Sequence, residues 1–277
     1  MVDIRQSIHY ANYLKRGGWI VERINEINYF LKKFSIVGSV LKLQRPEKID
    51  FVTINKLCRK YRVFYMIIEP KDGSQEAGIT DLEFKLSKSP YLPSKTLQID
   101  LTKSKESIFK NFKKDARRAI KRGGVKIVKS YSSPNEIKAW RRVWKNSVSF
   151  NRMVAGEEQI INLRKSFPGS YSVFLASHNI SGSVIGGALF TRSSHDIAYY
   201  WYGFTNSEGR TSLSQYSLLW QGLLWAKKMG CKIFDFEGVY DERFPMKSWL
   251  GFSHFKKSFG GVEVLYPGAY VMNRLPL

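Results

Sequence analysis

Hydrophobic and polar positions along the chain predict two runs of elements in the same order. The first run begins with a helix over residues 7–16, capped by Ser7. Three short, partly alternating extended segments follow at 19–24, 28–34 and 37–43. Turn-length gaps separate them, which is typical of an antiparallel meander. A helix over 51–61 and a continuous apolar strand over 63–70 complete the run.

The second run repeats this order further along the chain. Its meander consists of extended segments at 172–177, 183–191 and 197–205. A helix over 212–229 follows, with Gly230 as its stop signal, and residues 232–238 read as a strand. The two halves share no sequence similarity, but the shared order of elements indicates two related α/β modules in one chain.

A strongly basic segment lies between the two runs. Residues 103–129 hold eleven Lys and Arg against two acids, and apolar side chains recur every fourth residue from Ile108 to Ile120. This spacing predicts a helix with one apolar stripe, ended by Gly123 and Gly124. Its cationic faces are either solvated or neutralise several phosphates of a polyanion. For the second case the candidate RNA-binding residues are Lys113, Lys114, Arg117, Arg118 and Lys121.

Composition and charge narrow the classes of protein and partner. The chain has 277 residues, 43% of them hydrophobic, which is typical of a globular protein with a sizeable core. Lys and Arg number 45 against 23 acids, a net charge of +22. We therefore expect a polyanionic partner: a nucleic acid, an anionic membrane surface or a phosphorylated substrate. The start has no apolar core of a secretory signal, and the two cysteines predict no disulfide scaffold, so we expect a cytoplasmic protein.

The usual catalytic signatures are absent from the sequence. It has no P-loop, no dinucleotide-binding glycine motif, no H-E-x-x-H and no G-x-S-x-G. None of its four histidines stands at metal-ligand spacing from another or from a cysteine, so we expect no metal site. An active site in this chain would work by positioning and electrostatics.

Three blocks of the sequence carry a resemblance to a known family. They are LQIDLTKSKESIFKNFKKDARRAIKRGGVKI at 97–127, IAYYWYGFT with SLSQYSLLWQGLLWAKKMGC at 197–231, and KIFDFEGVYDERFPMKSWLGFSHFKKSFGG at 232–261. In this order and spacing they resemble the Fem family of peptidoglycan peptidyltransferases (FemX, FemA and FemB types). The last block matches the family's strand, loop and F-K-x-x-F-G pattern. With the N-terminal meander, the resemblance covers nearly the whole chain.

The resemblance implies an α/β fold of two tandem acetyltransferase-like (GNAT-like) domains, with mixed sheets flanked by helices. We place the first domain at 1–132 and the second at 133–262, with the tail 263–277 returning to the first. The chain has no room for the coiled-coil arm of the FemA and FemB types.

The resemblance also implies a reaction. An aminoacyl group would move from aminoacyl-tRNA to a stem-peptide amine of a peptidoglycan precursor, either UDP-linked or lipid-linked. No cofactor is implied beyond the aminoacyl-tRNA donor, and we expect a monomer. A lipid-linked acceptor would bring the protein into peripheral contact with the anionic inner face of the membrane.

By resemblance, Lys256 is the cation that stabilises the oxyanion of the transfer, and Phe255 shapes its setting. Asp235, Glu237 and Asp100 are candidate bases, with a turn-capping role as the alternative for Asp235. Glu237 stands where many relatives have glycine. Lys257 is a further candidate for substrate binding.

Four more candidates are carried over for binding the acceptor. Lys42, Arg45 and Arg152 correspond to the lysine and arginine with which the FemX type grips a diphosphate, and a surface salt bridge is the alternative for each. Tyr202 matches the family's aromatic strand tyrosine and would stack on a base or bind a sugar. The alternative for Tyr202 is a core position.

Two other functions remain open from the sequence. An acyl-CoA-dependent N-acyltransferase would share the fold, although the turn NSEGRTSLSQYS at 206–217 lacks the glycine pattern that such enzymes use for pyrophosphate. A non-catalytic basic protein that binds RNA or a membrane would account for 103–129, but it leaves the F-K-x-x-F-G block unexplained.

Overall fold

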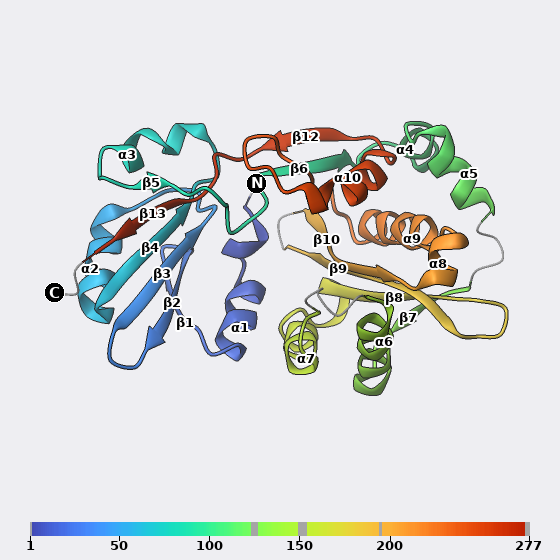
Figure 1. Ribbon diagram of the computed structural model, residues 1–277, viewed down its shortest axis with the longest axis horizontal. Coiled ribbons are helices and arrows are strands. Elements are labelled where there is room, and N and C mark those ends of the chain that lie inside the picture. The colour runs from blue at the N-terminus through green and yellow to red at the C-terminus, as the bar shows by residue number, and fades with distance from the viewer. Residues whose placement is uncertain (1, 123–126, 149–153, 194–195, 275–277) are drawn as a thin grey trace. The chain divides into compact units, whose positions relative to one another are not determined.

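The computed structural model describes residues 2–122, 127–148, 154–193 and 196–274. It divides into two compact units (Figure 1). The first comprises Met1–Thr96, Gly238–Leu250 and Val264–Leu277, and the second Leu97–Glu237 and Gly251–Glu263. These bounds differ from the change at residue 132 expected from the sequence. Strand β6 (Lys95–Asp100) belongs to the sheet of the second unit, so that unit begins well before the basic segment.

The first unit is built on a six-stranded mixed sheet with strand order β1-β2-β3-β4-β13-β5. The strands are β1 (Ile20–Ile24), β2 (Ile27–Phe34), β3 (Gly38–Gln44), β4 (Val63–Glu69), β5 (Lys85–Leu86) and β13 (Tyr270–Asn273). The helices and 3₁₀ turns are η1 (Ile4–Gln6), α1 (Ile8–Arg16), α2 (Phe51–Tyr61), η2 (Gly73–Gln75), α3 (Ala77–Thr80) and η5 (Lys247–Trp249).

Capping and burial explain the order of elements in this unit. The Asp50 carboxylate accepts hydrogen bonds from the first backbone N–H groups of α2, and Arg62 ends the helix in the left-handed conformation. The chain then returns as β4, parallel to β3, with Leu41 opposite Met66. Side chains of α2 join the apolar cluster on one face of the sheet, while α1 packs against Phe30 in a separate cluster.

The second unit is built on a seven-stranded sheet with strand order β12-β6-β11-β10-β9-β8-β7. Besides β6, the strands are β7 (Ile127–Tyr131), β8 (Ser172–His178), β9 (Val184–Arg192), β10 (Ile197–Thr205), β11 (Ile233–Gly238) and β12 (Val262–Leu265). The helices and 3₁₀ turns are α4 (Lys105–Lys110), α5 (Lys114–Arg122), α6 (Pro134–Ser147), α7 (Glu157–Ser166), η4 (Gly169–Tyr171), α8 (Ser207–Thr211), α9 (Ser214–Lys228) and α10 (Leu250–Lys257).

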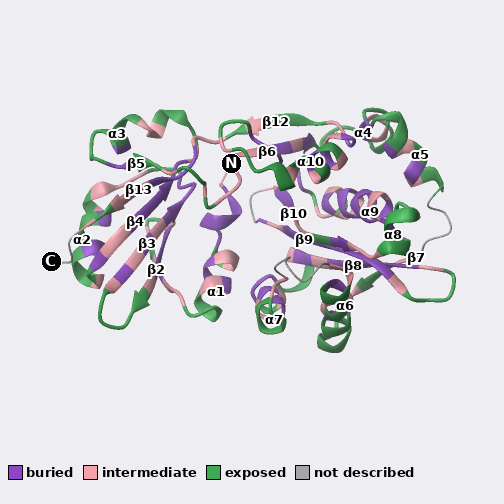
Figure 2. Cartoon of the chain, in the orientation of Figure 1, coloured by how far each residue is buried: buried purple, intermediate pink, exposed green. Residues whose placement is uncertain are grey.

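The sheet of the second unit repeats the arrangement of the first. Strands β8, β9 and β10 run antiparallel, and β11 returns parallel to β10 after α8 and α9. Helix α6 packs Trp140 against Phe174 and Phe204 on one face, and α9 packs Trp225 against Phe190 on the other (Figure 1). The central strands of both sheets are largely buried (Figure 2). The repeated order of elements predicted from the sequence is therefore confirmed.

The basic segment differs from the single helix predicted. It forms two helices, α4 and α5, because the N–H of Lys113 donates to the Ser258 carbonyl (2.8 Å) and leaves the helical pattern. Gly260, at φ +71°, packs so closely that a Cβ would lie 2.8 Å from the Asn111 carbonyl oxygen. The Arg117 guanidinium donates to the Lys110 and Phe112 carbonyls, which satisfies the acceptors freed at the break. A turn from elsewhere in the chain thus divides a segment whose apolar spacing alone indicates one helix.

Candidate active site

Lys256 lies in the last turn of α10, in the second unit, with only 8% of its surface exposed. Its neighbour Lys257 has an ordinary surface environment: the side chain is 41% exposed and pairs with Glu263 at 2.6 Å. Fully buried lysines are rare in proteins unless they are paired or functional. The two adjacent lysines predicted as site residues therefore differ sharply, and Lys256 is the unusual one.

The Lys256 ammonium lies in a buried, aromatic setting. Its Nζ is 5.0 Å from the centroid of the Phe252 ring and 5.6 Å from that of the Tyr200 ring. Burial lowers the pKa of Lys256 to about 8, and the charges of Glu237 and Asp235 partly oppose this shift. At pH 7 a group with this pKa is about nine-tenths protonated. The second unit thus holds a buried cation whose field water screens only weakly.

Asp235 and Glu237, on β11, supply the negative charges near this lysine. Asp235 is 2% exposed, and its two carboxylate oxygens accept hydrogen bonds from Gln98 Nε2 (2.8 Å) and the Glu237 backbone N–H (2.6 Å). Asp235 lies within the strand rather than at its end. Glu237 has a left-handed backbone, at φ +59°. Glycine adopts that conformation freely, which accounts for the glycine that the family resemblance expects there.

Tyr200 is a site residue that the sequence analysis missed. A β-bulge at Trp201 shifts the register of β10, so Tyr200 pairs with Phe190 and Tyr202 with Leu189. Tyr200 Oη accepts a hydrogen bond from Gln215 Nε2 on α9 (2.6 Å), and burial raises the pKa of its phenol. The sequence alone did not single out Tyr200, because it gives no sign of the bulge.

The bulge separates Tyr202 from Lys256. The Tyr202 ring packs 4.9 Å from Trp144 of α6, on the face of the sheet opposite α9. The structure therefore does not bring Tyr202 together with the lysine site. Gly203 explains how Tyr200 fits where it does, since a Cβ at this position would overlap the Tyr200 hydroxyl.

Phe255 belongs to an aromatic cluster that supports α10. Its ring lies 4.8 Å from Tyr216 of α9 and 5.5 Å from Phe259, which is itself fully buried. Phe259 also contacts Phe112 and Phe236. This cluster fixes the end of α10, so Phe255 acts on the position of Lys256 through packing.

Lys42 lies in the first unit, on β3. Its Nζ is 5.1 Å from the centroids of both the Trp19 and the Tyr91 rings, and burial lowers its pKa. Tyr91 also lines a cavity of about 230 Å³ whose walls are residues 88–94, 239–241, 244–246 and Trp249. Lys42 is thus a half-buried cation beside a small aromatic cavity.

Arg45 is built into the core of the first unit. Its guanidinium pairs with Asp3 (3.0 Å), donates to the Pro93 carbonyl (2.6 Å) and stacks on Tyr266 at 3.4 Å. Its backbone is left-handed, at φ +47°. These contacts make Arg45 a structural residue of this unit. Arg152, predicted to bind the same diphosphate, lies outside the described residues.

The predicted RNA-binding residues lie on and just before α5. Lys113, Lys114, Arg118 and Lys121 are exposed, while Arg117 is partly buried and bonded to main-chain carbonyls. The buried face of this helix is formed by Ala116 and Ala119. Four cations of the predicted set are therefore presented to solvent.

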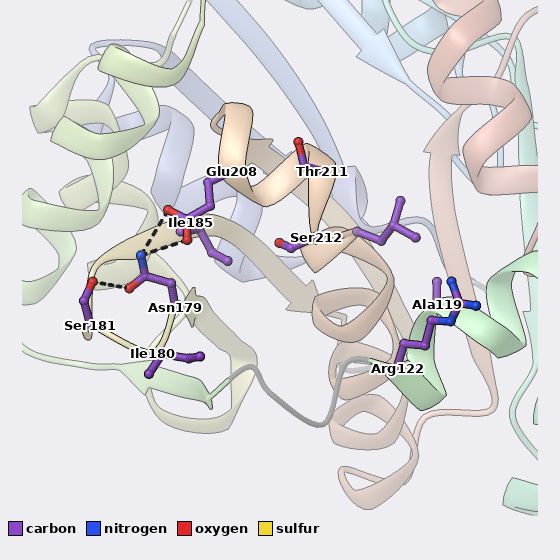
Figure 3. A pocket seen from close by; sticks show the side chains of 10 residues that line it. Ala119, Arg122, Asn179, Ile180, Ser181, Ile185, Glu208, Thr211 and Ser212 are labelled. Carbon is purple, nitrogen blue, oxygen red and sulfur yellow. Dashed lines mark hydrogen bonds between the residues drawn. The ribbon is translucent and has the colours of Figure 1, made fainter.

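A cavity of about 590 Å³ lies in the second unit beside the end of α5 (Figure 3). It is lined by Ala119, Arg122, Asn179, Ile180, Ser181, Ile185, Glu208, Thr211, Ser212 and Leu213. Asn179 donates to both carboxylate oxygens of Glu208 (2.9 and 3.0 Å). Leu213, which also lines the cavity, precedes the 15-residue helix α9 and provides no side-chain cap. The cavity wall therefore holds one guanidinium, Arg122, and one carboxylate, Glu208, and the cavity lies beside the residue that precedes α9.

No protein-family model and no curated protein matches the chain. Solved structures do match. A FemX crystal structure superposes with a TM-score of 0.83 at 14% identity, over 98% of this chain and 92% of that one. The chain has a FemX-like fold. The fold expected from the three sequence blocks, with two acetyltransferase-like units of mixed sheets flanked by helices, is thus confirmed.

Two further solved structures are similar in fold to this chain. The C-terminal domain of a protein described as a lysylphosphatidylglycerol synthetase, from Agrobacterium fabrum, has a TM-score of 0.62 at 12% identity, over 98% of this chain and 89% of that one. A tandem GNAT protein from the clavulanic acid biosynthesis pathway has a TM-score of 0.55 at 9% identity, over 89% and 82%. Within the described residues, no helix has the length and apolar character needed to span a membrane. The likeness is one of fold, and the case for an activity rests on the residues of the site.

Proposed function

We propose that this chain transfers an aminoacyl group from aminoacyl-tRNA to an amine on the stem peptide of a peptidoglycan precursor, UDP-linked or lipid-linked. The observation that carries this proposal is the buried Lys256 ammonium, held by α10 against Tyr200 and Phe252. The FemX-like fold and the exposed cations of α5 support it. The charge of +22 suits two polyanionic substrates.

The chemistry needs a fixed positive charge and close positioning. The acceptor amine attacks the ester carbonyl of the donor, and a tetrahedral intermediate with an oxyanion forms. A cation that is already in place stabilises this oxyanion without reorganisation, an effect worth about 10²- to 10³-fold in rate for one such contact. Lys256 is the group we assign to this role. Lys256 is buried among aromatic rings, so water screens its field less than it screens a charge at the surface.

The reaction balances without an added acid or base from solution. The new amide N–C bond forms as the ester C–O bond breaks, the amine loses one proton, and the leaving ribose oxygen gains one. Both oxygens of Asp235 already accept hydrogen bonds, from the Gln98 side chain and the Glu237 backbone N–H. We therefore assign Asp235, with Glu237, to keeping Lys256 charged.

We assign donor binding to the second unit. The exposed cations of α5 would contact phosphates of the tRNA, and the cavity beside Arg122 would receive an anionic part of its end. For the acceptor, Lys42 remains our candidate phosphate contact, since it stands half-buried beside an aromatic cavity. The Arg45 guanidinium already contacts Asp3, Pro93 and Tyr266, so we do not assign it to the phosphate.

One observation favours a second function. The cavity at the uncapped start of α9 would suit the pyrophosphate of an acyl-CoA as well as a nucleotide phosphate. An acyl-CoA-dependent N-acyltransferase would use the same lysine site with a thioester donor. The missing glycine pattern at 206–217 argues against it, because side chains there limit how closely backbone amides approach a pyrophosphate.

A donor-exchange assay tests the proposal. The purified full chain is mixed with UDP-linked or lipid-linked precursor and either a charged total-tRNA pool or an acyl-CoA pool, and product masses are read. We expect a mass gain of one amino-acid residue with charged tRNA only. A gain with acyl-CoA only would favour the second function. Binding of tRNA without any transfer would favour a non-catalytic RNA-binding protein.

A further inference from the structure

The hairpin between β2 and β3 exposes three large apolar side chains at its tip. Phe34, Ile36 and Val37 are 48%, 89% and 57% exposed, in the sequence FSIVG. Gly38, at φ +114°, closes the turn, and a Cβ there would overlap the Arg62 carbonyl oxygen. The hairpin is therefore held tightly at its base while its apolar tip stays in solvent. Single exposed apolar residues are ordinary, but a cluster at a protruding turn marks an interaction surface.

Cationic segments surround this tip at the same end of the first unit's sheet. Lys32 donates to the Gly18 carbonyl (2.9 Å), which places the end of α1 beside β2. The Ser39 N–H donates to the Arg62 carbonyl (3.0 Å), which places the end of α2 beside β3. The Phe34 and Phe64 rings lie 6.2 Å apart, and the Arg274 N–H donates to the Phe64 carbonyl. We call this end of the unit, residues 15–18, 32–39, 59–64 and Arg274, the basic tip.

Charge in the basic tip is of one sign. Its cations are Lys15, Arg16, Lys32, Lys33, Arg59, Lys60, Arg62 and Arg274, and its segments contain no acid. Glu22 of β1 contacts the basic tip through Lys60 (2.7 Å) and the Tyr61 hydroxyl. Exposed apolar side chains with cations around them are typical of a protein surface that binds an anionic membrane and inserts into its headgroup region.

We propose that the basic tip binds an anionic lipid bilayer, with Ile36 and Val37 entering the headgroup region and the surrounding cations contacting lipid phosphates. The side chains at the apex favour lipid over nucleic acid. Proteins bind single-stranded RNA by stacking aromatic rings on bases, whereas branched aliphatic side chains gain free energy by leaving water for the acyl boundary. The proposal goes beyond the transfer reaction and does not depend on it.

Vesicle co-sedimentation of the full chain tests this. The vesicles contain phosphatidylglycerol and phosphatidylcholine in equal parts, or phosphatidylcholine alone. We expect binding to the anionic vesicles and a loss of at least about tenfold in partitioning for the double variant Ile36→Ser, Val37→Ser. The matched control is Val52→Ser, because Val52 is 65% exposed in the first turn of α2 and lies outside the basic tip. This variant should bind as the wild type does.

A second pair of variants tests the charge. Lys33→Gln with Arg59→Gln should weaken vesicle binding and its salt dependence, while Arg142→Gln with Lys145→Gln on α6 should not. All four side chains are exposed, so thermal unfolding should be unchanged and serves as the folding control.

Three results would overturn the proposal. One is vesicle binding by the Ile36, Val37 variant equal to wild type. Another is loss of binding only when the cations of α5 are removed. A third is an equal loss of tRNA binding in the tip variant, which would make the surface an RNA site. Transfer to the UDP-linked acceptor should be unaffected by the tip variants, so this proposal and the proposed activity fail separately.

Discussion

Lys256 carries a charge that folding has to bury. Its pKa falls from the usual 10.5 to about 8 in the folded state. Below pH 8 both states hold the proton, and the folded state is less stable by about 3 kcal/mol on account of this group. The penalty disappears as the pH rises from 8 to 10.5, where only the unfolded state stays protonated. A chain that keeps such a lysine gives up stability, which is typical of a functional site.

The same pKa predicts the pH dependence of the reaction. If the Lys256 cation stabilises the oxyanion, the rate of transfer should fall as the pH rises through about 8. In Lys256→Arg the alkaline fall should move to higher pH, whatever the absolute rate, because the guanidinium stays protonated. Initial rates between pH 6 and 9, corrected for spontaneous ester hydrolysis, measure this. A wild-type rate that keeps rising to pH 9 would exclude a cationic role for Lys256.

At the scale of elements, α5 sets the expected salt dependence of RNA binding. Replacing Arg118 and Lys121 by Gln should weaken tRNA binding at low salt. It should also reduce the slope of log affinity against log salt by roughly 1 to 2, because fewer counterions are released. Both side chains are exposed, so the fold should be unaffected.

The matched control for α5 is the pair Arg142→Gln and Lys145→Gln on α6, which also removes one arginine and one lysine. Its slope should stay near that of the wild type. Filter binding at four or more salt concentrations gives both slopes. Affinity that does not change with salt in the wild type would contradict phosphate contacts by α5.

Single elements were predictable where the local pattern decides them. The helix at 51–61 follows from its apolar spacing and the Asp50 cap, and β4 from a continuous apolar run. The break between α4 and α5 was not predictable, since it depends on the Ser258 carbonyl from a distant turn. The bulge at Trp201 likewise depends on pairing with β9 and leaves no mark in the sequence.

At the scale of the whole molecule, the order and spacing of the three sequence blocks carried the family resemblance that implied the fold. The environment of each side chain had to come from the structure. The sequence indicated Lys256 by resemblance, but its environment depends on Tyr200 of β10 and Asp235 of β11, which lie far from it in sequence. The two units are also interleaved along the chain, because residues 238–250 and 264–277 join the first unit after the chain has formed most of the second. Contacts between residues distant in sequence thus define both the lysine site and the units.

The central claim is that Lys256 is the catalytic cation. A comparison of the variants Lys256→Met and Lys257→Met tests it most directly. Both variants remove one ammonium from adjacent positions of α10, and Lys256→Met should unfold at a denaturant concentration no lower than wild type, since it removes a buried charge. Initial rates of aminoacyl transfer at pH 7 are then compared. We predict a loss of about 10²-fold or more for Lys256→Met and a rate within a few-fold of wild type for Lys257→Met. Equal rates in the two variants would contradict the assignment of Lys256 as the catalytic cation.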